Sequence, residues 1–224
     1  MDTLLQIWQS IAGVAQKSSG MDMAQLLALA AALGWASGIR LYAVVFITGM
    51  AGYMGWLPLP PGLSVLQHPA LLAGSGFMLF IEFFADKIPG LDTLWDLVHS
   101  VIRVPAGAAL AAGVFGADSA TMGLLAGLLG GSLAATSYAT KATTRAALNT
   151  SPEPFSNIAM SLFEDGLVIG MMWLATQHPV AFGVALTILL VLSIWLLVVL
   201  LNFLKGLMRR VSAWFSNVEM AQPS

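Results

Sequence analysis

The chain has 224 residues, of which 58% are hydrophobic and 9% are charged, and its mean hydropathy is +0.85. Soluble domains carry roughly 25% charged residues, so this composition excludes a water-soluble fold, and it is too apolar for a disordered chain. The formal net charge of −2, without a basic patch, excludes nucleic acid as a partner, and the absence of cysteine excludes disulfides and thiolate metal sites. The sequence therefore predicts an all-α polytopic membrane protein.

Residues 1–20 form a segment of their own. Apolar side chains recur on one face of a helix at Leu4, Trp8, Ile11 and Ala15, with Gln6, Gln9, Ser10 and Lys17 elsewhere. A helix with this pattern lies along the membrane interface, with its tryptophan at the level of the lipid headgroups. We therefore expect residues 1–20 to be an interfacial amphipathic helix that anchors the chain.

Six segments have the composition of membrane-spanning helices, which take about 20 residues each. They cover residues 34–56, 69–88, 103–117, 121–143, 155–176 and 180–204. The third is short, so we expect it to begin earlier or to lie beside a protein-lined cavity. Residues 24–33 are expected to form a separate interfacial or re-entrant piece. Gly34, Ser37 and Gly38 would permit the break after it.

Lysine and arginine placement predicts the orientation in the membrane. Lys205, Arg209 and Arg210 follow the last span, so we expect the basic tail 205–224 to be cytoplasmic. Six crossings would place both termini on that side. The loops assigned to the other side contain no lysine or arginine, and they are residues 57–68, 118–120 and 177–178.

Residues 21–204 are expected to form a single transmembrane domain of two similar halves, about 24–117 and 121–204. Each half has a helix of small residues, then a cation, a proline turn and an acid inside a span. Three spans per half would orient the halves oppositely, as in a 3+3 inverted repeat with broken or re-entrant helices. Small-residue helices and proline turns also occur without duplication, so a plain bundle stays open.

Several cations lie inside the predicted spans, where a charge is costly unless it faces a partner or water. Arg40 has Tyr42 beside it, and Lys141 and Arg145 are four residues apart on one helical face. Guanidinium and ammonium groups bind carboxylate and phosphate oxygens. We expect these four residues to bind an anionic substrate group.

Four acids lie in or at the ends of the same spans. Glu82 and Asp86 share one helical face, and Glu164 and Asp165 are adjacent in the fifth span. Two acids held close together bind a proton more readily than one alone, so we expect these four to carry coupling protons or cations. The alternative is that acids and cations form interhelical salt bridges that fix packing only.

A second constellation follows the proline-glycine turn at residues 89–90. Asp92, Asp96, His99 and Arg103 form one stripe of a helix, and Asp92 would cap its start. Together with Asp86, the two aspartates and the histidine are candidate ligands for a divalent cation. Alternatively, Asp96 orients His99 as a proton relay or gate and Arg103 holds an anion. A plain amphipathic helix facing the cytoplasm also stays open.

The motifs of nucleotide-driven and nucleophilic chemistry are missing. The chain contains no Walker loop, no dinucleotide fingerprint and no Gly-x-Ser-x-Gly elbow. We therefore expect no cofactor and no ATP-driven transport by this chain alone.

The run Ala-Asp-Lys-Ile-Pro at 85–89 is the centre of a wider pattern. The pattern includes Gly38-Ile39-Arg40, Glu82, Asp92, Asp96, His99, Ile102-Arg103, Ala106-Gly107 and Phe163-Glu164-Asp165. Over residues 26–200 the chain resembles a bacterial integral membrane family known only as a domain of unknown function, DUF4126. The resemblance implies a helical protein of the bacterial inner membrane, and it implies no substrate.

Three functional hypotheses follow. The first is a secondary transporter coupled to protons or cations, or a lipid-translocating protein, for a small anionic or phosphate-bearing substrate. The second is a metal-dependent membrane enzyme that acts on a phosphate-bearing lipid. The third is a non-catalytic scaffold whose charges only fix helix packing. We expect transport rather than catalysis, with membrane lipids and the anionic substrate as partners and a homo-oligomer left open.

Overall fold

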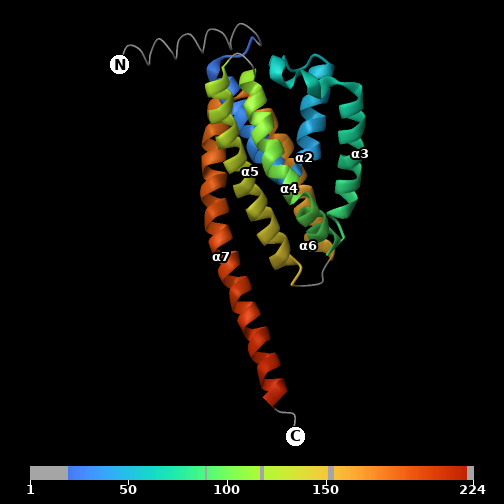
Figure 1. The fold of residues 1–224 in the computed structure, drawn as a ribbon, viewed down its shortest axis with the longest axis vertical. Helices are drawn as coiled ribbons and strands as arrows, with labels where there is room; N and C mark the ends of the chain where they lie inside the picture. The colour runs from blue at the N-terminus through green and yellow to red at the C-terminus, as the bar shows by residue number, and fades with distance from the viewer. Residues whose placement is uncertain (1–19, 89, 117–118, 151–153, 221–224) are drawn as a thin grey trace, which may run out of the picture.

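The computed structural model describes residues 20–88, 90–116, 119–150 and 154–220, which form helices joined by short connections (Figure 1). The helices are α2 (Met23–Tyr53), the 3-10 helix η1 (Pro61–Gln67), α3 (Pro69–Ala85), α4 (Leu91–Phe115), α5 (Ala120–Leu148), α6 (Pro154–Gln177) and α7 (Pro179–Met220). Five of these are long and apolar enough to cross a membrane, or six if η1 and α3, which meet at 68°, form one bent span. The predicted all-α membrane fold is therefore confirmed. The predicted interfacial helix lies outside the described residues, apart from Gly20.

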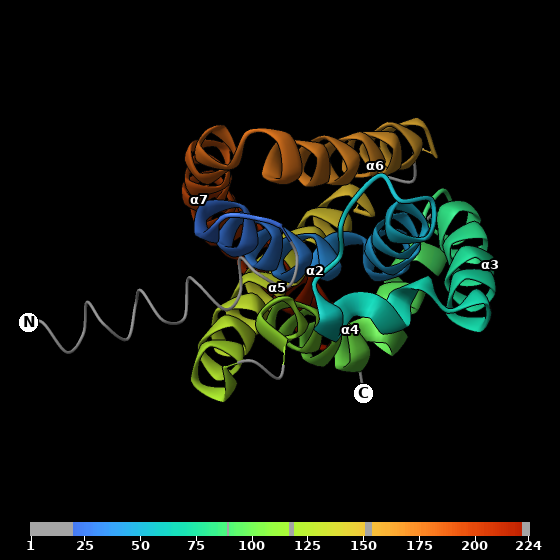
Figure 2. The same ribbon diagram turned by 90° about the horizontal axis from the view of Figure 1, so that it is seen from above.

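Helix α2 is broken near its middle. Arg40 has φ −143° and ψ 72°, outside the helical region, and the two limbs, 23–39 and 41–53, run back to the same end of the bundle (Figures 1 and 2). The first limb lies inside the bundle and packs against α4, α5, α6 and α7. Helix α2 is thus a re-entrant pair of half-helices with Arg40 at its apex.

The break does not lie where the sequence predicted it. Residues 24–33 continue as one helix through Gly34 and Gly38, and most of their side chains are buried rather than interfacial. These glycines serve packing instead. A Cβ atom at Gly34 would lie 2.5 Å from the Cα atom of Gly130, and one at Gly38 would overlap the carbonyl group of Ala134. Both glycines therefore bring the first limb close to α5, as small residues do between membrane helices.

The re-entrant helix changes the predicted topology. Helices α3 to α7 alternate in direction, so the described chain begins at one end of the bundle and α7 leaves at the other (Figure 1). The expectation that both termini share a side assumed six crossings, whereas α2 returns to the end where it starts; the termini themselves lie outside the described residues, so their placement stays a prediction. Which end faces the cytoplasm stays a prediction. The third span does begin earlier, since α4 starts at Leu91.

The two halves of the chain run in opposite directions, as an inverted repeat requires. The second limb of α2, then α3 and α4, alternate in the opposite sense to α5, α6 and α7 (Figure 1). In any bundle whose helices alternate in direction, one group of three helices runs opposite to the next three, whether or not the sequence is duplicated. The inverted repeat therefore stays a prediction.

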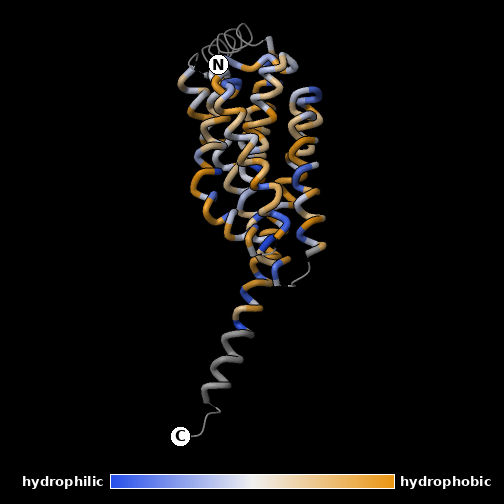
Figure 3. Tube along the Cα trace, turned by 90° about the vertical axis from the view of Figure 1, so that its right-hand side faces the viewer, coloured by the Kyte–Doolittle hydropathy of each residue, from blue (hydrophilic) through white to orange (hydrophobic). Residues whose placement is uncertain are grey.

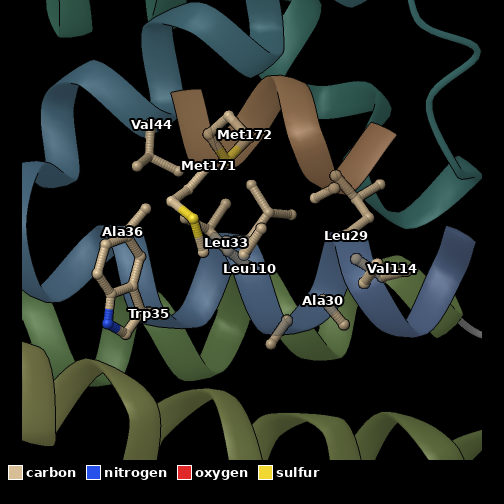
Figure 4. Close-up of a cluster of buried hydrophobic side chains, with 14 of the residues drawn as sticks. Leu29, Ala30, Leu33, Trp35, Ala36, Val44, Leu110, Val114, Met171 and Met172 are labelled. Atoms are coloured by element: carbon tan, nitrogen blue, oxygen red, sulfur yellow. The ribbon is translucent and has the colours of Figure 1, made fainter. Parts of the chain in front are cut away.

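Apolar side chains surround the first limb of α2 (Figure 4). Leu29, Leu33 and Ala36 of α2 belong to one buried cluster with Leu110 of α4 and Met171 of α6. Lipid tails are as apolar as these side chains, so close packing rather than the hydrophobic effect holds such helices together. Figure 3 shows mostly apolar residues along the helices of the bundle, which suits outer faces that contact lipid.

Replacing Gly34 with alanine is expected to lower the free energy of unfolding by about 1–3 kcal/mol, because the new methyl group overpacks the contact with Gly130. The thermal unfolding midpoint in detergent measures this loss. Gly183→Ala on α7 is the matched control, since no atom lies within 4 Å of a Cβ atom there, and it should keep or raise the midpoint. Equal midpoints for the two variants would contradict the close contact between the limb and α5.

Candidate functional site

The predicted charged residues gather in one ion-pair network near the break in α2. Ion pairs connect ten of them, namely Arg40 of α2, Glu82 of α3, Asp86 at the end of α3, Asp92, Asp96 and Arg103 of α4, Lys141 and Arg145 of α5, and Glu164 and Asp165 of α6. Nine of the ten residues are at most 4% exposed, and the Asp165 side chain is 22% exposed. The structure thus joins charges from both halves of the chain.

Three cations, which we call the cation trio, converge on two carboxylates. The trio consists of Arg40, Lys141 and Arg145. The Oε2 atom of Glu164 lies 2.9 Å from Arg145 Nη2, 3.6 Å from Lys141 Nζ and 3.7 Å from Arg40 Nη2. The Oδ2 atom of Asp86 pairs with Arg40 and lies 3.2 Å from Lys141 Nζ and 4.0 Å from Arg145 Nη2. Positive charge is therefore concentrated around one carboxylate from each half.

Charged side chains bind backbone oxygens at the break in α2 and on the facing helix α6. Lys141 Nζ donates a hydrogen bond to the Ile39 carbonyl oxygen at 3.1 Å. Arg40 Nη2 donates to the carbonyl and hydroxyl oxygens of Ser161 in α6, at 3.1 and 2.8 Å. Helix C-termini carry partial negative charge, which favours a cation there. The broken helix and the cation trio therefore stabilise each other.

Arg103 extends the network along α4. Its Nη2 lies 2.6 Å from Glu82 Oε1, and its Nη1 lies 2.7 Å from Asp96 Oδ1, which is also 3.2 Å from Lys141 Nζ. The Oε2 atom of Glu82 is buried and has no hydrogen-bond partner among the described residues. At this end of the network, Arg103 thus forms ion pairs with two buried acids, Glu82 and Asp96.

Asp92 lies at the edge of the network and organises the turn after α3. Its Oδ1 accepts hydrogen bonds from the backbone amides of Gly90 and Thr93, at 2.9 and 2.7 Å, and from Asn149 Nδ2 at 3.0 Å. Its Oδ2 lies 3.6 Å from Arg145 Nη1. The N-cap of α4 is Gly90, so the prediction that Asp92 caps this helix is wrong; Asp92 lies in the first turn of α4 and connects it to the end of α5.

His99 and Tyr42 lie beside the network rather than within it. The His99 ring stacks on Trp95 with 4.1 Å between centroids, and its Nδ1 lies 2.8 Å from the Trp95 carbonyl oxygen. The Tyr42 ring meets His99 edge-on at 5.6 Å. Among the described residues no hydrogen bond joins His99 to Asp96, so the predicted relay between them is not formed.

The candidate metal ligands do not assemble into a metal site. Within the part of the chain that the structure describes, no three His, Cys, Asp or Glu side chains are arranged to hold a metal ion. Asp86 and Asp96 pair with cations instead, and His99 bonds to Trp95. The geometry therefore does not support the metal-dependent alternative.

Ser161, Asn157 and Asn149 support the network without having been predicted to do so. Ser161 Oγ accepts a hydrogen bond from Arg40, and Asn157 Nδ2 donates to Asn149 Oδ1 at 2.9 Å. Asn157, Ser161 and Glu164 are spaced by four and three residues, which places them on one face of α6. This polar stripe is a signal that sequence reasoning could have used.

Two cavities reach the network on different sides. The first, which we call the lateral cavity, has a volume of about 210 Å³ between α2, α5, α6 and α7, with Lys141 and Glu164 in its wall. The second is an apolar groove of about 490 Å³ between α2, α3 and α6 that ends at Asp165. Glu82 lines neither of them. Two separate cavities therefore reach the network, one at Lys141 and Glu164 and the other at Asp165.

Asp86 differs from the other acids because it lies in the turn after α3, outside the candidate spans. Burial raises the pKa of its carboxyl group, but Lys141, Arg40 and Arg145 together lower that pKa by more. The pKa of Asp86 therefore lies below the usual value for aspartate. Asp86 is expected to stay ionised and to keep the cation trio assembled.

Comparison with known proteins identifies a family but no characterised relative. No curated protein and no solved structure matches the chain. A family model described as a domain of unknown function (DUF4126) matches residues 27–199, a range that contains every member of the ion-pair network. The resemblance carried by the run at 85–89 is thus confirmed, and the chain belongs to the DUF4126 family.

Proposed function

We propose that this protein is a proton-coupled secondary transporter, or a lipid-translocating protein, for a small anionic or phosphate-bearing substrate. The proposal rests on the convergence of the cation trio on Asp86 and Glu164 at the break in α2. Many secondary transporters bind substrate and coupling ions where membrane helices are broken, and Arg40 lies at such a break. Clustered guanidinium and ammonium groups suit carboxylate or phosphate oxygens.

The charge balance of the network gives a reason for coupling to protons. Its ion pairs join four cations to six carboxylates, and Lys87, whose Nζ lies 3.4 Å from Ser161 Oγ, adds a fifth cation beside them, so one negative charge remains in excess when every member is ionised. An uncompensated charge in a buried site within a membrane protein is costly. A substrate anion therefore needs the neutralisation of a carboxylate as it binds. Uptake of the anion is thereby coupled to uptake of a proton.

Glu164 is the carboxylate that we expect to take up this proton. It lies in the wall of the lateral cavity, and its Oε2 contacts all three members of the cation trio. Because the same trio surrounds Asp86 and Glu164, we expect Glu164 to take up its proton only as an oxygen of the substrate replaces its carboxylate beside the three cations. Glu82 and Asp165 each have a buried oxygen without a hydrogen-bond partner among the described residues, and they are the candidates for a second proton.

The same ion pairs favour one other function, a membrane scaffold without transport. Arg40, Arg103 and Arg145 are fully buried, and each contacts at least two carboxylates, which is also how charges would fix helix packing. A scaffold needs no proton exchange and no substrate. The two functions therefore differ in what happens when a buried pair is replaced by apolar residues of similar size.

Reconstitution into liposomes with an imposed pH gradient tests the transport proposal. The probes are radiolabelled inorganic phosphate and a phosphatidylglycerol with a fluorescent chain, whose transfer between leaflets is read by chemical bleaching of the outer leaflet. The wild-type protein is expected to move one of these probes faster when the side of addition is acidic. Liposomes without protein give the background rate for each probe.

Glu164→Gln is expected to lower the pH-dependent part of this flux by about tenfold or more, because the amide cannot exchange a proton. Size-exclusion chromatography and the thermal midpoint confirm that the variant is folded. Thr187→Val, at an exposed position of α7, is the handling control and should behave as wild type. If Glu164→Gln supports the same pH-dependent flux as the wild type, Glu164 is not the coupling site.

A further inference from the structure

Both polar and apolar residues line the lateral cavity. Helix α5 contributes a polar stripe of residues that share one helical face, namely Ser137, Thr140, Lys141 and Thr144. Helices α6 and α7 contribute apolar side chains, among them Met160, Phe163, Leu189 and Leu192. The accessible surface of the cavity is almost entirely apolar, with the charged groups of Lys141 and Glu164 at its wall, so it fits an amphiphile better than it fits a small hydrated ion.

Polar atoms in the wall of this cavity lack partners. Trp35 is 2% exposed, and its Nε1 has no hydrogen-bond partner among the described residues. Figure 4 shows this nitrogen at the edge of the apolar cluster, on the side of α5. The hydroxyl oxygen of Thr144 is also buried and unpaired within the described chain. Buried polar groups are nearly always hydrogen-bonded, and both atoms lie just beneath the cavity surface, so a headgroup that displaces the side chains covering them would pair with both.

The cavity is bordered by surface that faces lipid. Phe163 and Leu192, which line it, are 58% and 52% exposed, and Val191, Ile194 and Trp195 on the same helix, α7, are exposed as well. Exposed apolar side chains on a membrane-spanning helix contact acyl chains. A soluble anion would have to cross this apolar rim, whereas the hydrocarbon chain of a lipid would be stabilised by it.

We infer that the anion bound by the cation trio is the phosphate- or carboxylate-bearing headgroup of a membrane amphiphile, which enters sideways from the bilayer through the lateral cavity. The inference rests on the proposed function and adds the class of substrate and its route. The headgroup lies against Lys141 and against the unpaired groups of Trp35 and Thr144. The hydrocarbon chain lies between α6 and α7 and extends into the surrounding lipid.

Photolabelling of the full-length protein in phosphatidylcholine nanodiscs tests this inference. The probe is phosphatidic acid with a photoreactive group in its acyl chain, and mass spectrometry of peptides locates the label. We expect label on cavity residues of α6 and α7, such as Phe163 and Leu189. Unlabelled phosphatidic acid should compete, and neither added phosphatidylcholine nor inorganic phosphate should do so.

Leu192→Trp is expected to fill the cavity and to lower this labelling by about tenfold or more. Val191→Trp is the matched control, because Val191 is 63% exposed and does not line the cavity. Equal labelling of the two variants would overturn the inference, as would label confined to Phe80 and Phe83 in the groove at Asp165. Thr144→Val, which removes only an unpaired hydroxyl, should weaken competition by phosphatidic acid.

The flux assay separates this inference from the proposed function. If the protein moves inorganic phosphate in a pH-dependent way and Leu192→Trp does not slow that movement, the substrate is a soluble anion. The amphiphile inference then fails although the transport proposal holds. If Leu192→Trp instead abolishes pH-dependent transfer of phosphatidylglycerol and Val191→Trp does not, the lateral route is supported.

Discussion

Replacing Arg40 with alanine is expected to lower the free energy of unfolding by about 3–5 kcal/mol. The Arg40 side chain is fully buried, pairs with Asp86, and places its Nε 3.0 Å from Asp165 Oδ1. Its removal leaves Asp86 and Asp165 without one of the cations that pair with them. Thermal and chemical unfolding of the purified protein in detergent measure the loss.

Two further variants make the Arg40 result specific. Arg209→Ala, at an exposed position of α7, removes the same side chain and should change stability by less than about 0.5 kcal/mol. Arg40→Lys keeps the charge but loses the planar fork that reaches several oxygens, so its stability should lie between that of alanine and that of the wild type. If Arg40→Ala were as stable as Arg209→Ala, the cation at the break would not be needed for the fold.

Replacing Arg103 alone and replacing it together with Glu82 are expected to have opposite outcomes. Arg103→Met should cost about 3–5 kcal/mol, because Glu82 loses its ion-pair partner in a fully buried site. The double variant Glu82→Met with Arg103→Met should regain most of this loss, since the pair is then replaced by apolar side chains of similar length. Asp96 keeps its contact with Lys141 in both variants. Unfolding midpoints of the two variants and of the wild type test this.

The double variant also separates a scaffold from a transporter. A scaffold needs only the packing, so a stable Glu82→Met/Arg103→Met protein would keep its biological activity. A transporter that uses Glu82 as a proton site would be folded and would show altered pH dependence in the liposome assay. A double variant that is no more stable than Arg103→Met alone would contradict the account of Arg103 as the partner of Glu82.

Hydropathy predicted the positions of most helices, because a helix surrounded by lipid needs a long apolar segment. Helices α5 and α6 lie close to the predicted spans. Helix α4 begins well before residue 103, because the charged stripe that seemed to end the span is buried against the network. Charge marks the end of a membrane helix only where the charge meets water, and Asp92, Asp96 and Arg103 meet other helices instead.

The residues of the site could be predicted, but their partners could not. Charges inside membrane helices are rare and costly, so Arg40, Lys141, Arg145 and Glu164 were recognisable without a structure. Spacing along one helix suggested that Asp96 acts on His99, whereas the structure pairs Asp96 with Arg103 and Lys141. A periodic pattern shows which side chains share a face, and it carries no information about the helix that faces them.

The sequence by itself determined that this is a helical membrane protein with a small set of interior charges, because composition alone decides which segments are stable in lipid and which side chains need a partner there. Only the tertiary structure decided where α2 breaks. No proline or glycine occupies position 40. Lys141 binds the Ile39 carbonyl oxygen at the break, and Ser161, 121 residues from Arg40, binds the Arg40 side chain. A conformation stabilised by contacts so distant in the chain has no local signal, and it is this conformation that brings the cation trio together.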